Sequence, residues 1–122
     1  MNIAIIMLGS NIKTDINLEL AKEKLSTYFD IIKESSIITS KPYGKHYLSD
    51  FQNKAVKLLS VETKEETISI FKNIEMEMDR TLESKQSGKI PIDIDLIFWN
   101  ENQVHRDYDR FEFVRKCVDE IR

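Results

Sequence analysis

An alternation of apolar and acidic residues in the last third of the chain constrains the fold most strongly. Residues 92–99 read Ile-Asp-Ile-Asp-Leu-Ile-Phe-Trp, and a period of two is typical of a strand with one buried face. Asp93 and Asp95 then project side by side from the other face, about 6.5 Å apart along the backbone. Two carboxylates at that spacing repel each other, and a hard divalent cation such as Mg²⁺ would neutralise both. The pair predicts a metal site, with a merely solvated strand face as the alternative.

Length and composition limit the class of protein to which the chain can belong. The chain has 122 residues, of which 41% are hydrophobic and 32% charged, and its net charge is −3. These values predict a single folded domain over residues 1–122 and do not favour nucleic acid as a partner. The apolar run at residues 3–8 is too short to span a bilayer, and the single cysteine, Cys117, fits a reducing compartment. We therefore expect a cytoplasmic protein with no membrane partner. A monomer is the expected state, although no sequence feature determines it.

The hydrophobic pattern predicts alternating strands and helices. Residues 2–8 are typical of a fully buried central strand, and Gly9-Ser10-Asn11 ends it in a turn. Asp15 is the expected cap of a helix that runs to Phe29. The further expected elements are strands at 31–40 and 51–61 joined by a loop at 41–50, a helix from Thr63 to Leu82 that starts in a capping box, a loop at 83–91, the strand of residues 92–99 and a helix from Asp107 to Ile121.

The order of these elements predicts an α+β fold. Strand, helix, strand, strand, helix, strand is the order of the ferredoxin-like split βαβ arrangement, an antiparallel sheet with helices on one face. We expect the first and last strands to be neighbours at the centre of the sheet, and strands 31–40 and 51–61 to pair antiparallel. The C-terminal helix is additional to this unit. Such a fold hosts many functions, so the function must be argued from particular residues.

Four short motifs, in a consistent order along the chain, point to one enzyme family. They are Leu8-Gly9-Ser10-Asn11, Ser40-Lys41-Pro42-Tyr43-Gly44, Phe51-Gln52-Asn53-Lys54-Ala55-Val56 and Ile92-Asp93-Ile94-Asp95-Leu96-Ile97. On these motifs, which fall within residues 3–100, the chain resembles the 6-hydroxymethyl-7,8-dihydropterin pyrophosphokinases. The resemblance implies a ferredoxin-like fold and a reaction of folate biosynthesis. In that reaction the terminal diphosphate of ATP is transferred to the hydroxymethyl group of a reduced pterin, and AMP is released.

The resemblance implies a metal and nucleotide side of the site. Asp93 and Asp95 match the pair that holds two Mg²⁺ ions on the phosphates of ATP, where the ions neutralise charge and align the attack. Arg80 matches a phosphate-contacting arginine with a catalytic role. Glu75 matches a glutamate of the nucleotide site. ATP is therefore the expected co-substrate and Mg²⁺ the expected cofactor.

The resemblance also implies a pterin side. Asn53 matches a side chain whose amide reads the hydrogen-bonding edge of the pterin, since an amide offers both a donor and an acceptor. Phe51 and Phe113 match aromatic residues on the two faces of the ring, where stacking and apolar burial favour a flat heterocycle. The residues implied at the edge of the ring are Ser40, Lys41, Pro42 and Tyr43.

Departures from the family pattern fall on the nucleotide side. The usual tryptophan and arginine are absent from residues 83–91, and no Pro-His pair follows the Asp-x-Asp strand. Lys89 and Arg110, with Arg106 as the alternative to Arg110, are the candidates to replace these phosphate contacts. Two other functions stay open: a non-catalytic pterin-binding or regulatory protein derived from the family, and a structural ferredoxin-like interaction module.

Three further side chains have simpler interpretations. His46 and His105 lie in expected loops with no second ligand at a recognisable metal spacing, so both are interpreted as surface residues. Cys117 is interpreted as a small buried apolar residue rather than a nucleophile.

Overall fold

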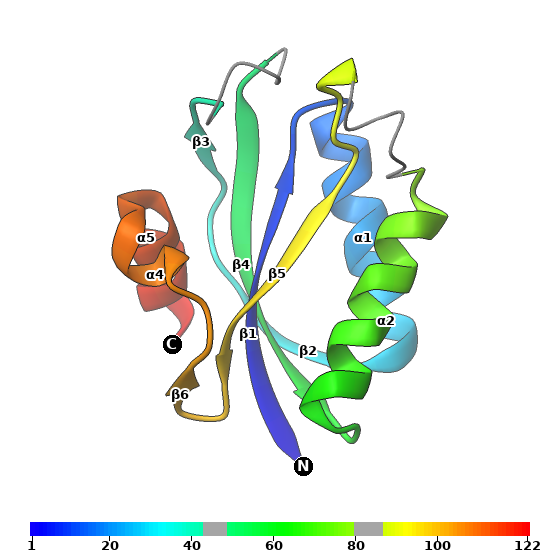
Figure 1. Ribbon diagram of the computed structural model, residues 1–122, viewed down its shortest axis with the longest axis vertical. Helices are drawn as coiled ribbons and strands as arrows, with labels where there is room; N and C mark the ends of the chain where they lie inside the picture. Colours follow the sequence, from blue (N-terminus) through cyan, green and yellow to red (C-terminus); the bar gives the residue numbers. More distant parts are fainter. Residues whose placement is uncertain (43–48, 80–86) are drawn as a thin grey trace.

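The computed structural model describes residues 1–42, 49–79 and 87–122 (Figure 1). Within these ranges no helix combines the length and apolar character needed to cross a membrane. The strands are β1 (Asn2–Ser10), β2 (Asp30–Glu34), β3 (Ile38–Ser40), β4 (Phe51–Ser60), β5 (Asp93–Trp99) and β6 (Asn102–Gln103). The helices are α1 (Thr14–Tyr28), α2 (Lys64–Glu77), α4 (Asp107–Arg110) and α5 (Glu112–Ile121).

One antiparallel sheet organises the described residues. Its strands lie in the order β2-β4-β1-β5-β6, and the short β3 pairs with the first residues of β4. β1 and β5 are neighbours, as the element order predicts, and the segments expected at 31–40 and 51–61 do pair antiparallel. The ferredoxin-like α+β fold predicted from the sequence is therefore confirmed.

Helices α1 and α2 cover one face of the sheet (Figure 1). β1 contributes Ala4, Ile6 and Leu8 to this face, and all three are fully buried. The other members of this core are Leu18, Ala21, Leu25, Phe29, Val56, Leu58, Phe71, Ile74, Met78, Ile92, Ile94 and Leu96. Side chains point alternately to the two faces of a sheet along each strand. The apolar residues of the alternation, Ile92, Ile94 and Leu96, therefore point to this face.

The C-terminal segment lies against the opposite face (Figure 1). A second core forms there from Ile5, Met7, Ala55, Ile97, Phe98, Val114, Cys117, Val118 and Ile121. The expectation of helices on one face therefore holds for α1 and α2, while the additional C-terminal helix covers part of the other face. The burial of Cys117 in this core confirms its interpretation as a small apolar residue.

The segment expected as one strand at 31–40 is two strands. β2 and β3 are separated by residues 35–37. Ser35 keeps the chain attached to β4 across this break, because its N–H donates to the oxygen of Ala55 (2.9 Å) and its hydroxyl accepts from the nitrogen of Ala55 (2.8 Å). The polar middle of the segment thus interrupts the strand, while the chain stays hydrogen-bonded to β4.

The starts of the two long helices differ in their caps. α1 follows Lys13, which has a φ of 43° and no side-chain capping bond. The expectation that Asp15 caps this helix is wrong: Asp15 lies in the first turn, where its charge favours the helix dipole instead. In α2 the expected cap is confirmed, since the Thr63 hydroxyl accepts from the nitrogen of Glu66 at 3.1 Å.

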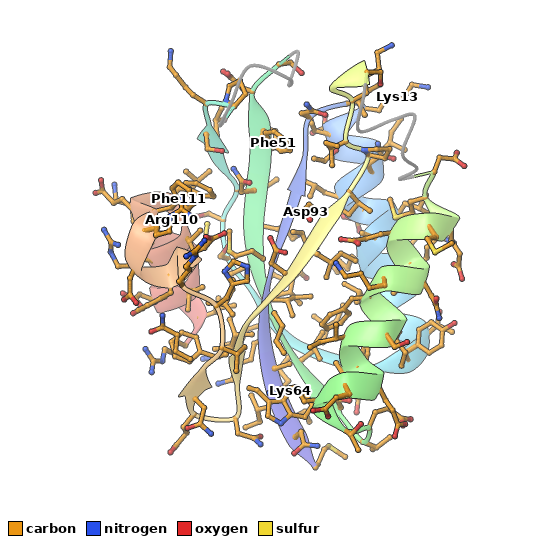
Figure 2. The ribbon with its side chains drawn as sticks, in the orientation of Figure 1. Lys13, Phe51, Lys64, Asp93, Arg110 and Phe111 are labelled. Carbon is orange, nitrogen blue, oxygen red and sulfur yellow. The ribbon has the colours of Figure 1, made fainter. Side chains whose placement is uncertain are left out.

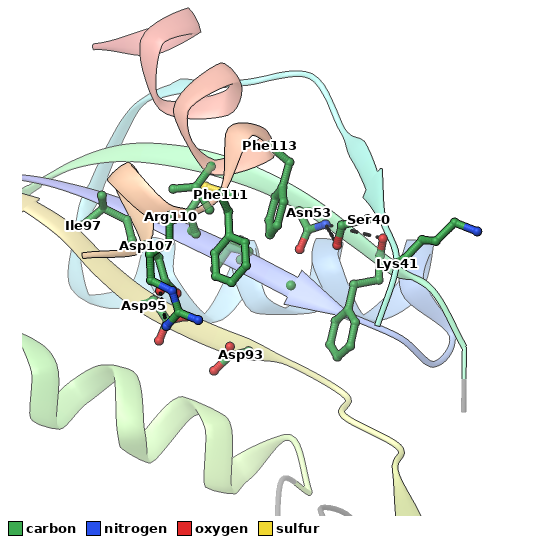
Figure 3. Close-up of a pocket in the computed structure, with 15 residues that line it drawn as sticks. Ser40, Lys41, Asn53, Asp93, Asp95, Ile97, Asp107, Arg110, Phe111 and Phe113 are labelled. Atoms are coloured by element: carbon green, nitrogen blue, oxygen red, sulfur yellow. Dashed lines mark hydrogen bonds and ion pairs between the residues drawn. The ribbon is translucent and has the colours of Figure 1, made fainter. Parts of the chain in front are cut away.

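Two helices are shorter than the pattern predicts. α2 ends at Glu77, and the expected end at Leu82 lies outside the described residues. The helix expected from Asp107 to Ile121 is broken at Phe111, whose backbone is extended (φ −120°, ψ 122°). The break separates α4 from α5 and turns the aromatic residues around it towards the open part of the sheet (Figure 3).

The turn after β1 fixes the segments that lead into β4 and β5. The first four residues of the loop expected at 83–91 lie outside the described residues, but the rest is held by Asn11. The Asn11 Nδ2 donates to the oxygen of Gly88 (2.8 Å), and the nitrogen of the buried Ile90 donates to its Oδ1 (2.6 Å). The Ser49 hydroxyl donates to the backbone oxygen of Asn11 (2.7 Å). Asn11 therefore joins both segments to the end of β1.

Candidate functional site

Three neighbouring strands bring the polar motifs into one row. In the sheet register, Gly9 of β1 lies opposite Asn53 of β4 on one side and Asp93 of β5 on the other. Two residues along the strands, Met7 pairs with Asp95. Paired residues point to the same face of a sheet, so this row lies on the face that α5 only partly covers. Three of the four sequence motifs thus meet here.

An open cavity of about 290 Å³ lies over this row. Figure 2 shows Phe51, Asp93, Arg110 and Phe111 around it, from β4, β5 and the C-terminal segment. The lining residues are Met7, Leu8, Gly9, Ser40, Lys41, Phe51, Asn53, Asp93, Asp95, Ile97, Asp107, Arg110, Phe111, Phe113 and Val114 (Figure 3). The volume is near the lower end of the range for small-molecule sites.

The amide of Asn53 is oriented by its neighbours. Its Nδ2 donates to the oxygen of Ile38 (3.0 Å) and to the hydroxyl of Ser40 (2.8 Å), and the residue is 6% exposed. Because the nitrogen is engaged within the protein, the oxygen is the amide atom placed beside Gly9 at the floor of the cavity. The arrangement presents a fixed hydrogen-bond acceptor to a ligand.

Gly9 makes room for that acceptor. A Cβ atom at this position would lie 3.1 Å from Asn53 Oδ1 and 3.7 Å from Phe51 Cδ1. The first distance is tighter than ordinary van der Waals contact, so a side chain at Gly9 would push the amide out of place. The glycine of the first motif is therefore explained by close approach rather than by a turn.

Aromatic side chains line the cavity from two elements. Phe51 comes from β4, whereas Phe111 and Phe113 come from the C-terminal segment, and all three are half-buried. The Phe111 and Phe113 rings are 5.6 Å apart between centroids, with an angle of 32° between their planes. Half-buried rings that face an open cavity can stack on a flat ligand.

The two carboxylates of β5 stand at the edge of the same cavity. Burial raises the pKa of Asp95 to about 8, and repulsion and hydrogen bonding from Asp93 add to the effect, followed by the charges of Glu75 and Asp107. A divalent cation would stabilise the charged form that this environment disfavours. Carboxylate oxygens in this number and spacing fit the hard cation Mg²⁺.

Glu75 supports the carboxylate pair from the helix face. It is 4% exposed, and its Oε2 accepts from the nitrogen of Ile94 at 2.8 Å. Its Oε1 lies 3.6 Å from the Nζ of Lys72. Because Ile94 lies between Asp93 and Asp95, this bond holds the strand at the point where both carboxylates project.

A second hollow of about 330 Å³ lies between α2 and β5. Five of its lining residues are apolar, and two are the lysines Lys64 and Lys72. The lining residues are Lys64, Ile68, Phe71, Lys72, Ile94, Asp95, Leu96, Val104 and His105. Asp95 lines both cavities, so the two adjoin at this residue.

The site residues predicted from the sequence fall into three groups. Those that line the first cavity are Ser40, Lys41, Phe51, Asn53, Asp93, Asp95, Arg110 and Phe113. Those that are described but line neither cavity are Pro42, Glu75 and Lys89. Tyr43 and Arg80 lie outside the described residues.

Several residues that line the two cavities were not predicted as site residues, among them Lys64, Lys72, Phe111, Asp107 and His105. Phe111 was assigned to the apolar stripe of the C-terminal helix, Asp107 to the start of that helix, and His105 to the surface. Interpreting residues 107–121 as one helix concealed their position, because the break at Phe111 and the path of the chain after β6 place them over the sheet. No local sequence signal marks this path.

The fold and the cavity together define a class: a ferredoxin-like α+β domain whose open sheet face holds a candidate ligand cavity beside a carboxylate pair. Comparison with known families gives the narrower assignment. The sequence model of the 7,8-dihydro-6-hydroxymethylpterin-pyrophosphokinase (HPPK) family matches residues 5–122. The chain belongs to this family of folate-pathway pyrophosphokinases, which use ATP and Mg²⁺. The resemblance inferred from the motifs is confirmed.

Solved structures of Plasmodium falciparum HPPK-DHPS have a similar fold. They include a triple mutant with STZ-DHP (17% identity, TM-score 0.61), a single mutant with pteroate (17%, 0.60) and the wild type with SDX-DHP (16%, 0.58). The matches cover 98%, 98% and 99% of this chain, but 35% of each of those chains. This chain thus spans about a third of the length of those proteins, and identity at this level supports the fold alone.

Proposed function

We propose that this chain transfers the terminal diphosphate of ATP to the hydroxymethyl group of 6-hydroxymethyl-7,8-dihydropterin and releases AMP. The observation that carries the proposal is the row of Asn53, Gly9 and Asp93, which sets an aromatic-lined slot directly beside a carboxylate pair. Membership of the pyrophosphokinase family supports the reaction.

The first cavity suits the pterin. Phe51, Phe111 and Phe113 offer aromatic surfaces for a flat bicyclic ring. The Asn53 Oδ1 can accept from the ring's amino or ring N–H donors. The Ser40 hydroxyl accepts from Asn53 Nδ2, which leaves its own hydrogen for an acceptor on the ring edge. Lys41 lies at the rim of this cavity, and Pro42 and Tyr43 are proposed to lie at the same edge of the ring.

Asp93 and Asp95 are proposed to hold Mg²⁺, with two ions expected from the family resemblance. When bound, the ions neutralise the phosphate charge and orient the phosphates for in-line attack. The protein's own contribution is a rigid donor pair: both carboxylates project from β5, and the Glu75 bond to the nitrogen of Ile94 fixes the strand between them.

The second hollow is proposed to hold ATP. Its apolar lining residues suit the adenine base, and Lys64 and Lys72 provide cations near it. A nucleotide that lies there directs its phosphates to Asp95, where the two cavities adjoin. Arg110, which lines the first cavity, would then face the diphosphate from the other side. Positioning and electrostatic stabilisation supply most of the catalysis in such a transfer.

The proposal has three further parts. Arg80 and Lys89 are proposed to contact the phosphates, with Glu75 nearby. Residues 1–122 are proposed to act as a single domain, supported by the one sheet that carries both cores. The protein is proposed to work as a monomer in the cytoplasm.

The experiment that tests the proposed function is AMP formation from Mg-ATP with and without 6-hydroxymethyl-7,8-dihydropterin. We expect AMP to form only when the pterin is present. A sample that binds the pterin and releases no AMP would contradict the proposal and favour the non-catalytic pterin-binding protein.

A further inference from the structure

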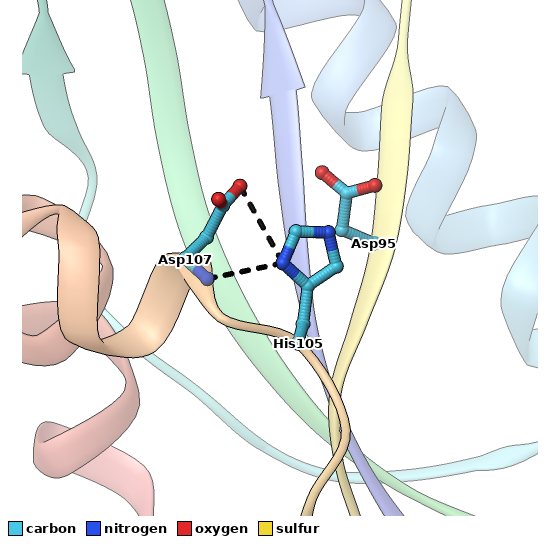
Figure 4. A group of neighbouring side chains, drawn as sticks. All are labelled: Asp95, His105 and Asp107. Carbon is cyan, nitrogen blue, oxygen red and sulfur yellow. Dashed lines mark hydrogen bonds and ion pairs between the residues drawn. The ribbon is translucent and has the colours of Figure 1, made fainter.

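A histidine and two aspartates meet at the mouth of the site. Asp95 comes from β5, His105 from the segment after β6, and Asp107 from the start of α4 (Figure 4). One ligand atom from each lies within 4.8 Å of the other two. All three side chains are partly exposed, so an ion from solvent can reach them.

The pair formed by His105 and Asp107 already has a spacing that suits a metal. The backbone nitrogen of Asp107 donates to His105 Nδ1 at 3.1 Å, so this ring nitrogen carries a lone pair rather than a proton. The same Nδ1 lies 3.6 Å from Asp107 Oδ2. Two ligands of a tetrahedral ion with bonds of about 2.0–2.1 Å are roughly 3.4 Å apart. Because Nδ1 has a single lone pair, an ion bound by Nδ1 and Asp107 Oδ2 replaces the hydrogen bond from the Asp107 nitrogen.

The donor set selects the kind of ion. Mg²⁺ prefers oxygen ligands and near-octahedral geometry, whereas an imidazole nitrogen with carboxylates suits Zn²⁺, Co²⁺ and Ni²⁺. The surrounding charge also favours a cation, because Asp93 lies two residues from Asp95 on the same face. Arg110 also lies near these carboxylates, with its Nη1 3.9 Å from Asp107 Oδ1.

An ion bound by these three residues would affect both cavities, because the residues line them. Asp95 and Asp107 line the first cavity, while Asp95 and His105 line the second. An ion bound by all three would sit at the junction and occupy Asp95. If the proposed function holds, that carboxylate is then withdrawn from Mg²⁺ and the phosphates.

We propose that Asp95, His105 and Asp107 form a site for a nitrogen-preferring divalent transition metal of the Zn²⁺ and Co²⁺ class. Occupancy of this site inhibits the Mg²⁺-dependent reaction. The metal binding stands on the three residues alone, whereas the inhibition rests on the proposed function.

Binding is tested with the full chain, without nucleotide or pterin. Co²⁺ is titrated and followed by its visible absorption, and Zn²⁺ is titrated by calorimetry. We expect one ion per chain, and an affinity at least about 10-fold weaker in His105→Asn and in Asp107→Asn. His46→Asn, which changes the other histidine in the sequence at a position outside the described residues, is the matched control and should bind like the wild type. Unchanged affinity in both test variants, or no binding by the wild type at micromolar metal, would overturn the proposal.

Inhibition is tested in the AMP assay. Zn²⁺ is added at fixed Mg-ATP, and each variant is compared with its own zinc-free rate. We expect the half-inhibitory Zn²⁺ concentration to rise about 10-fold or more in His105→Asn and not in His46→Asn. Equal inhibition of both variants would overturn the assignment of inhibition to this site. A protein that binds Co²⁺ but makes no AMP would separate failure of the proposed function from failure of the metal site.

Discussion

The two faces of the sheet are built from the same strands but covered differently. On the helix face, α1 and α2 close over Ala4, Ile6 and Leu8 of β1, and none of these three is exposed. On the other face, α5 packs on the same sheet, while Met7 and Gly9 line an open cavity. Consecutive residues of one strand therefore serve stability on one side and the candidate site on the other.

This difference explains how a small domain can carry polar groups next to its core. The carboxylate pair projects from β5 on the open face, while the residues between and beside it are anchored in the closed one. Glu75 links the two sides, because its side chain lies on the helix face and bonds to the backbone of Ile94. The site gains rigid support without being filled by apolar side chains.

The largest effect is expected at Asp95. Asp95→Asn keeps the shape of the side chain but removes the charge proposed to hold Mg²⁺, so turnover should fall on the order of 10³-fold. The measurement is pterin-dependent AMP formation, with circular dichroism to confirm the fold. Asp119→Asn, on α5, is the control and should retain activity. Near-normal turnover by Asp95→Asn would contradict the assignment of Asp95 as a ligand of Mg²⁺.

Two neighbours on β1 should separate stability from ligand binding. Ile6→Ala empties a fully buried position of the closed face, so we expect a loss of about 2–4 kcal/mol in unfolding free energy and an unchanged pterin affinity per folded molecule. Met7→Ala alters the cavity wall as well as the buried second core, so its pterin affinity should change together with its stability. Urea unfolding and equilibrium pterin binding measure the two quantities. Equal profiles for both variants would contradict the division between the faces.

The pH dependence of stability should reveal the carboxylate pair. The raised pKa of Asp95, about 8 in the folded protein, exceeds the value of about 3.9 expected in the unfolded chain. The folded state therefore binds more protons between these values, and metal-free stability should fall as pH rises from about 4 to 8. Because the side chain is partly exposed, we expect a loss of about 2 kcal/mol rather than the full linkage value.

The control for this measurement is Asp95→Asn, in which the fall should be much reduced. Denaturant unfolding at several pH values between 5 and 9, in the presence of a chelator, gives both profiles. A wild type whose stability rises over this range would contradict the assigned direction of the pKa shift.

The smallest expected effect is at Gly9. In Gly9→Ala the added methyl group would press on Asn53 Oδ1, 3.1 Å away, so pterin affinity should fall about 10-fold, or about 1.4 kcal/mol. Stability should change by less than about 1 kcal/mol. In an Asn53→Ala background, Gly9→Ala should lower the pterin affinity much less, because the amide oxygen that the methyl group would displace is absent. Additive losses would show that Gly9 does not act through the amide.

The parts of the molecule that follow strand periodicity were predictable. The alternation at residues 92–99 gives both the buried stripe and the paired carboxylates, and the apolar run of β1 gives a strand buried on two faces. The element order then gives the sheet topology. Asn53 and Phe51 share a face with Asp93 because the register brings them there.

The parts that depend on chain breaks were not predictable from periodicity. A helical stripe over residues 107–121 is compatible with one continuous helix, yet Phe111 is extended. That single break places Phe111 and Asp107 in the cavity wall. His105 was interpreted as a surface residue because its neighbours Asp95 and Asp107 come together only in three dimensions. Long-range contacts of this kind leave no pattern in a single sequence.

The central claim is that the open face of the sheet brings a pterin and the terminal diphosphate of ATP together. The most direct measurement is the fate of label from γ-³²P-ATP in a single turnover with Mg²⁺ and 6-hydroxymethyl-7,8-dihydropterin. The account predicts that label appears in a pterin diphosphate, one for each AMP formed. Label found only in ATP or inorganic phosphate, from a protein that binds both substrates, would contradict it.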